Sequence, residues 1–214
     1  MTQWQWQTWQ GQAFLTCDLL QPWPHGFFTR HWTQAPEGLT AALAKDAAVQ
    51  RVKQVHGSRV LRSADLSAAE AKAPRTEADG LLSDRAHQAL WVCSADCSPV
   101  LIGDRVTGQV AAVHAGWRGT AQSIVAVAVG KLQAQGSRLE DLSVAIGPAI
   151  AGEVYQVSVD VAAAVGRTIL GDALLDDEMT VDTLLQQEQS PVLADDAAGK
   201  VRLDVRRANA LQLE

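Results

Sequence analysis

The sequence predicts a soluble globular protein that mixes β-strands with α-helices around one core. Short runs rich in β-branched and aromatic residues, such as Gln88–Val92 and Pro99–Ile102, are typical of buried strands. The stretch Thr120–Gln135 is apolar on nearly every face and predicts a buried helix that ends before Gly136. With 214 residues, 47% of them hydrophobic, the chain is long enough to form a single domain over residues 1–214.

The first half of the chain predicts several short strands and one short helix. Trp4 and Trp6 alternate with polar residues, which predicts an edge strand whose tryptophans lie in the core, and a second strand follows at Gln12–Leu19. A proline and an early glutamate predict a short helix over Pro36–Asp46. Other expected elements are a strand ending at Thr29–Arg30, two short strands around a tight turn in Val49–Leu61, a helix or solvated loop at Ser63–Arg75, and a strand at Ala78–Ser83.

The second half predicts longer elements. A strand at Gln109–Val113 follows a glycine-bearing turn, and Thr120 can cap the apolar helix that comes next. Ser158 likewise can cap a helix. The remaining expected elements are a strand within Asp141–Ile150, the helix Ser158–Leu170, and a near-helical pattern over Val201–Glu214. The sequence contains no internal repeat. It also contains no linker long enough to separate two domains.

Composition excludes several classes of protein. The formal charge of −6 and the dispersed lysines and arginines argue against a nucleic-acid binder, which needs a concentrated basic face. The N-terminus has no secretory pattern and no apolar run is long enough to span a bilayer, so we expect a cytoplasmic protein without membrane contact. Three cysteines do not make a disulfide framework, and we expect reduced thiols.

Side chains that can do chemistry gather between Trp91 and Gly119, at the ends of predicted strands. The sequence has no phosphate-binding glycine loop, dinucleotide fingerprint, HExxH, CxxC or GxSxG motif, which excludes common nucleotide and hydrolase machinery. His56, Cys97 and His114 remain, and three such ligands with an open fourth position suit a catalytic zinc. Their long separations also fit a structural thiol and two hydrogen-bonded imidazoles.

A second interpretation uses the same residues as a thiol hydrolase. Cys97 would be the nucleophile and His114 its base. Asp96 could orient a histidine, transfer a proton, or only cap a turn. Arg118 precedes a predicted helix start, where it could complete a phosphate site or form a surface ion pair, and Arg30 has the same two alternatives.

Five ordered blocks of the sequence carry a family resemblance. They are KQVHG (Lys53–Gly57), ADGLLS (Ala78–Ser83), SADCSPVLIGD (Ser94–Asp104), AAVHAGWRGT (Ala111–Thr120) and AIGPAI (Ala145–Ile150). Together they resemble the signature blocks of the YfiH-type laccase-domain family, whose members are labelled polyphenol oxidases or purine nucleoside phosphorylases. HGFFTR and KQVHG are similar to its cyanobacterial branch. The resemblance implies an α+β fold of layered mixed sheets flanked by helices.

The resemblance also implies a site and an activity. Its histidines and cysteine fall on His56, Cys97 and His114 as zinc ligands, and its arginines fall on Arg30 and Arg118, while the acid of ADC falls on Asp96. The resemblance implies zinc ligation by His56, Cys97 and His114. It implies phosphate or ribose contacts for Arg30 and Arg118, and proton transfer or orientation for Asp96. The implied reactions are phosphorolysis of adenosine, inosine or methylthioadenosine to base and ribose 1-phosphate, and deamination of adenosine.

Two further expectations follow from comparing the chain with that family. A true multicopper laccase needs many imidazoles, and five histidines argue against it, so we expect zinc rather than copper. Family members normally continue past the LQLE helix, whereas this chain ends at Glu214, so we expect it to be short at its C-terminus. The alternatives to the nucleoside enzyme are therefore the Cys97 thiol hydrolase or deamidase and a non-catalytic metal-binding remnant.

Overall fold

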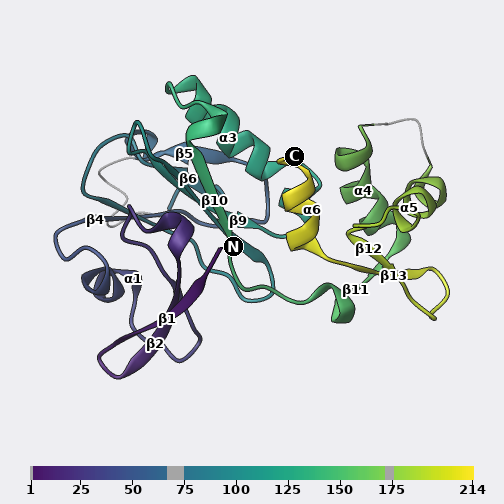
Figure 1. Ribbon diagram of the computed structural model, residues 1–214, viewed down its shortest axis with the longest axis horizontal. Coiled ribbons are helices and arrows are strands. Elements are labelled where there is room, and N and C mark those ends of the chain that lie inside the picture. The colour runs from purple at the N-terminus through teal and green to yellow at the C-terminus, as the bar shows by residue number, and fades with distance from the viewer. Residues whose placement is uncertain (1, 67–74, 172–175) are drawn as a thin grey trace.

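The computed structural model describes residues 2–66, 75–171 and 176–214, and its centre is a five-stranded mixed sheet with the order β10-β8-β9-β6-β5 (Figure 1). The strands are β5 (Val60–Arg62), β6 (Gly80–Leu82), β8 (Ser98–Asp104), β9 (Val110–Ala115) and β10 (Leu142–Ile146). β5 and β6 run parallel, and the other neighbours run antiparallel. The strands expected at Ala78–Ser83, Pro99–Ile102, Gln109–Val113 and within Asp141–Ile150 are confirmed.

One long helix covers a face of this sheet and supplies the main core. The helix α3 (Ile124–Ala134) buries Ile124 and Leu132 completely against strand residues such as Val113. This confirms the expected buried helix, but the helix does not start at Thr120 as expected. Thr120 ends a separate short helix, α2 (Trp117–Thr120), and α3 begins after Ser123, whose left-handed φ of 54° breaks the chain direction.

The N-terminal segment forms its own antiparallel sheet of β1 (Trp4–Trp9), β2 (Gln12–Cys17) and β3 (Phe27–Phe28). β1 and β2 extend away from the central sheet in Figure 1. The expectation that the tryptophan stripe lies in the core is wrong, because Trp4 is 42% and Trp6 63% exposed. An edge strand has one neighbour and can leave a face in solvent.

A parallel pair, β4 (Ala48–Arg51) and β7 (Gln88–Trp91), lies beside the central sheet. The two short strands expected within Val49–Leu61 are present, but they join different sheets, because β4 pairs with β7 and β5 with β6. The helix expected over Pro36–Asp46 is shorter: α1 (Pro36–Leu39) is followed by the 3-10 turn Thr40–Ala42. Most of the expectation for Ser63–Arg75 lies outside the described residues.

The C-terminal part contains a second buried cluster. It is built from the helices α4 (Val159–Leu170), α5 (Asp177–Leu185) and α6 (Val205–Leu211) and from the sheet β11-β13-β12, with strands β11 (Gln156–Ser158), β12 (Val192–Ala194) and β13 (Lys200–Leu203). Figure 1 shows the yellow helix α6 between the central sheet and α4 with α5. The helix-like pattern expected over Val201–Glu214 is therefore only partly right, since residues 200–203 form β13 and the Asp204 side chain caps α6.

The layered α+β fold expected from the sequence is confirmed. Its loops at one end of β8 and β9 carry the candidate site, since Pro99 pairs with His114 in the ladder between these strands. Within the described residues, no helix combines the length and the apolar character needed to cross a bilayer.

Candidate metal centre

Three separate segments bring His56, Cys97 and His114 together. His56 lies between β4 and β5, Cys97 immediately precedes β8, and His114 lies near the end of β9. One ligand atom from each of the three lies within 4.8 Å of the others, and the two imidazole rings are edge to face with centroids 5.0 Å apart. The structure thus brings together the three side chains singled out in the sequence, in an arrangement that could hold one metal ion.

The three side chains differ in exposure. His114 is 4% exposed, Cys97 is half-buried and His56 is exposed. Because burial decreases from one ligand to the next, the cluster has a buried side and a side open to solvent. An open side is what a catalytic metal site needs, since a substrate or a water must reach the metal.

Two glycines of the HAGWRG block let these segments approach closely. A Cβ atom on Gly116 would lie 2.7 Å from Cys97 Sγ and 3.6 Å from His56 Cδ2. A Cβ on Gly119 would lie 2.9 Å from the carbonyl oxygen of Gly57. Side chains at these positions would therefore force the thiol and the His56 turn out of their present positions.

The electrostatic surroundings of Cys97 bear on the thiol-hydrolase interpretation. Burial raises the pKa of the Cys97 thiol, and the carboxylates of Asp96 and Asp79 raise it further. A cysteine nucleophile needs the opposite, a pKa lowered by nearby positive charge. A bound divalent cation would supply that charge and favour the thiolate as a ligand. The surroundings therefore suit a metal ligand better than a free nucleophile.

Sequence reasoning missed two residues at this site. Asp79, in the ADGLLS block, is fully buried, and its carboxylate lies 2.9 Å from His114 Nδ1. Tyr155 is half-buried; burial raises the pKa of its hydroxyl, Cys97 and Asp96 raise it further, and Arg118 lowers it, so these groups lie within electrostatic reach of one another. The carboxylate before a buried strand was the available signal for Asp79. Tyr155 follows no recognisable motif.

The other expected site residues lie on the surface. Arg118 lies inside α2 rather than before it, and its guanidinium carbon lies 4.4 Å from the centroid of the neighbouring Trp117 ring. Asp96 is exposed, and its carbonyl oxygen accepts a hydrogen bond from Ile150 N–H. Arg30 lies in an exposed turn after β3, with no hydrogen bond or ion pair to the three candidate ligands in the described part of the chain.

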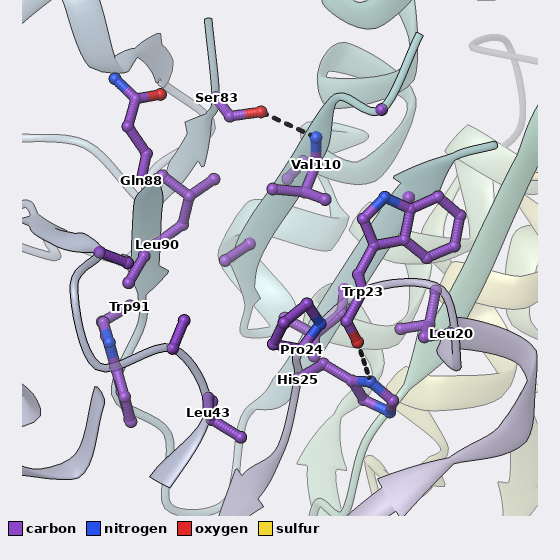
Figure 2. Close-up of a pocket in the computed structure, with 18 of the residues that line it drawn as sticks. Leu20, Trp23, Pro24, His25, Leu43, Ser83, Gln88, Leu90, Trp91 and Val110 are labelled. Carbon is purple, nitrogen blue, oxygen red and sulfur yellow. Dashed lines mark hydrogen bonds between the residues drawn. The ribbon is translucent and has the colours of Figure 1, made fainter. Parts of the chain in front are cut away.

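A separate cavity of about 400 Å³ lies between β7 and the strands β8 and β9. Figure 2 shows Leu90 and Trp91 on one side of it and Trp23 on the other. Its lining is mainly apolar and does not include His56, Cys97 or His114. The candidate metal centre is therefore distinct from this cavity.

The chain is similar to known proteins in sequence and in structure. A family model described as multi-copper polyphenol oxidoreductase laccase matches residues 33–214. A purine nucleoside phosphorylase of Synechocystis sp. is 49% identical over 214 residues, which cover 98% of this chain and 81% of the relative. A purine nucleoside phosphorylase of Deinococcus radiodurans is 37% identical over 129 residues, which cover 60% of this chain and 48% of that relative.

Two solved structures share the fold. YlmD from Geobacillus stearothermophilus matches with a TM-score of 0.66 at 29% identity, over 83% of this chain and 62% of that one. The hypothetical protein YfiH of Bacillus licheniformis matches with a TM-score of 0.64 at 27% identity, over 83% of this chain and 63% of that one. The chain thus spans less than two thirds of either solved relative.

Proposed function

The chain belongs to the laccase-like YfiH family, and from this membership we propose that it is a zinc-dependent purine nucleoside phosphorylase. The observation that carries the proposal is the convergence of His56, Cys97 and His114 on one point with an open side. The names of the Synechocystis and Deinococcus relatives support nucleoside and phosphate as substrates. We further propose that residues 1–214 act as one domain.

The donor set favours zinc over copper. Two imidazoles and one thiolate with an open position match the ligands of catalytic zinc. A multicopper oxidase needs a blue-copper centre and a further copper cluster, and the five histidines of this chain are too few to ligate them. The oxidase description of the family therefore does not extend to copper chemistry in this chain.

Three exposed residues have roles in the proposed reaction. Arg118 and Arg30 would hold phosphate against the ribose carbon, and Asp96 would deliver a proton to the departing base. The bond from ribose C1′ to the purine nitrogen breaks, and a bond from C1′ to a phosphate oxygen forms. The base leaves with the bonding electron pair and takes the proton. When bound, zinc would act as a Lewis acid that stabilises negative charge on a substrate oxygen or nitrogen.

The same site would also deaminate adenosine. Water would add its oxygen to the purine carbon that bears the amino group, and ammonia would leave, giving inosine. Adenosine, inosine and methylthioadenosine are the proposed phosphorolysis substrates.

The test combines metal content with product analysis. Elemental analysis would measure zinc in the wild type, in Cys97→Ala and in the control Cys93→Ala, which removes an exposed thiol in the same loop. Chromatography would measure adenine, hypoxanthine and inosine after incubation with adenosine and phosphate. We expect about one zinc per chain and these products in the wild type and the control, and neither in Cys97→Ala. Zinc without products would identify a metal-binding module, and absence of zinc from all three proteins would refute the ligand assignment.

A further inference from the structure

We propose that Asp79 is the positioning residue of the metal centre and that its carboxylate fixes two of the three ligands at once. The inference rests on the proposed function, because it concerns how His56 and His114 are presented to a metal. Asp79 is fully buried at the start of β6, where Gly80 pairs with Val113 of β9. This register places Asp79 beside His114.

Each carboxylate oxygen of Asp79 makes two polar contacts. Oδ1 accepts a hydrogen bond from the backbone N–H of His56 at 2.9 Å and lies 2.9 Å from His114 Nδ1. Oδ2 accepts from the backbone N–H groups of Val55 at 3.2 Å and Gly57 at 2.8 Å. One buried group therefore connects the turn that carries His56 with the strand that carries His114.

The contact with His114 selects the nitrogen that faces the site. When Nδ1 of a neutral imidazole donates its proton to this carboxylate, Nε2 is the atom with a free lone pair for a metal ion. The backbone strengthens this arrangement, because His114 N–H donates to the carbonyl oxygen of Asp79 at 2.7 Å. The two contacts with Asp79 therefore orient the His114 ring and favour the tautomer whose Nε2 can bind an ion.

The contacts with the turn hold a strained backbone. His56 has a φ of 59°, in the left-handed region, which costs a non-glycine residue roughly 1 kcal/mol or more. Three successive backbone N–H groups, those of Val55, His56 and Gly57, point at one carboxylate. Such a group of N–H donors is a ready-made anion site, and Asp79 fills it from inside the fold. The carboxylate therefore stabilises the conformation that turns His56 toward Cys97.

The net charge of a metal ion bound to these ligands also favours a carboxylate at this position. Among the described residues, the Asp79 carboxylate contacts the His114 ring and forms no salt bridge with a lysine or arginine. A divalent cation bound by one thiolate and two neutral imidazoles leaves one positive charge, which Asp79 balances. A buried carboxylate without a lysine or arginine is costly, and a nearby metal ion offsets that cost.

The experiment compares zinc affinity in matched variants. Asp79→Asn keeps the shape of the side chain, removes its charge and places an NH₂ group against N–H donors. Glu77→Gln is the control, because it removes a carboxylate two residues away that is exposed and paired with Lys53. Competition with a chromogenic chelator should show zinc binding weakened about 10–100-fold in Asp79→Asn and within about twofold of wild type in Glu77→Gln.

Two spectroscopic readouts separate positioning from general destabilisation. The visible bands of the cobalt-substituted protein should shift in Asp79→Asn and stay unchanged in Glu77→Gln, because only the first variant alters ligand geometry. In zinc-loaded wild type, ¹⁵N NMR of His114 should show a protonated Nδ1 and a metal-bound Nε2. This last measurement decides the question even if Asp79→Asn does not fold.

The possible failures are distinguishable. Metal ligation through Nδ1 of His114, or wild-type affinity and an unshifted cobalt spectrum in folded Asp79→Asn, would overturn the role of Asp79 and leave the metal centre intact. Wild-type protein that binds neither zinc nor cobalt would overturn the metal centre, and the role of Asp79 with it.

Discussion

Gly116→Ala tests whether the close approach of the HAGWRG block to Cys97 matters for metal binding. The new Cβ would lie 2.7 Å from Cys97 Sγ, about 1 Å inside the roughly 3.5–4.0 Å of a favourable nonbonded contact. Gly116 has φ −75° and ψ 169°, which alanine adopts without strain. The substitution therefore acts by displacing the thiol, not by straining the backbone.

The size of the effect follows from the precision that a metal site demands. Ligand distances are held within about 0.2 Å, so a displacement near 1 Å must weaken or lengthen the bond to sulfur. We expect zinc affinity to fall about 10–100-fold, which corresponds to about 1.4–2.8 kcal/mol. Gly116 also precedes the first residue of α2, where alanine is less favourable than glycine, so metal-free stability should fall by about 1 kcal/mol or less.

The assay measures zinc affinity by chelator competition and metal-free stability by urea unfolding. Gly130→Ala is the matched control, because Gly130 lies in α3 with nothing within 4 Å of a Cβ. This control should bind zinc like the wild type and gain about 0.5–1 kcal/mol of stability. Wild-type zinc affinity in folded Gly116→Ala would refute the reasoning.

Three further predictions concern stability. Leu132→Ala opens a cavity under the central sheet and should cost about 2–5 kcal/mol in urea unfolding; a loss below 1 kcal/mol would contradict the assigned core. Asn209→Ala leaves the buried Thr120 hydroxyl without its donor and should cost about 1–3 kcal/mol; an unchanged urea midpoint would contradict this. Burial alone would raise the pKa of Asp104, but neighbouring hydrogen-bond donors, among them the backbone N–H groups of Val106 and Thr107 that donate to Oδ1, outweigh it and lower that pKa. The stability that Asp104 contributes is therefore present above about pH 4 and lost as the pH falls through the lowered pKa. The free energy of unfolding of Asp104→Asn should therefore depend less on pH below about pH 4 than that of the wild type.

Local patterns predicted most of the central elements correctly. The β-branched runs around Leu90, Leu101 and Ala112 became β7, β8 and β9, because a buried strand needs apolar side chains on both faces. The apolar segment up to Gln135 became α3 for a similar reason, with Gly136 adopting a φ of 101° just beyond it. Two of the predictions that failed, burial of the β1 tryptophans and the pairing of β4, concern which element packs on which. The start of α3 and the strand β13 are instead errors in the boundaries of local elements.

The candidate site shows the same difference between what local patterns predict and what packing between elements decides. The sequence by itself determined that His56, Cys97 and His114 end or interrupt apolar runs, since a polar side chain in a buried strand is visible in the pattern. Only the tertiary structure decided that the three meet within 4.8 Å, because sheet pairing, and not distance along the chain, brings them together. Only the register of β6 on β9 places Asp79 against His114, since moving the pairing by one residue would turn that carboxylate to the other face of the sheet.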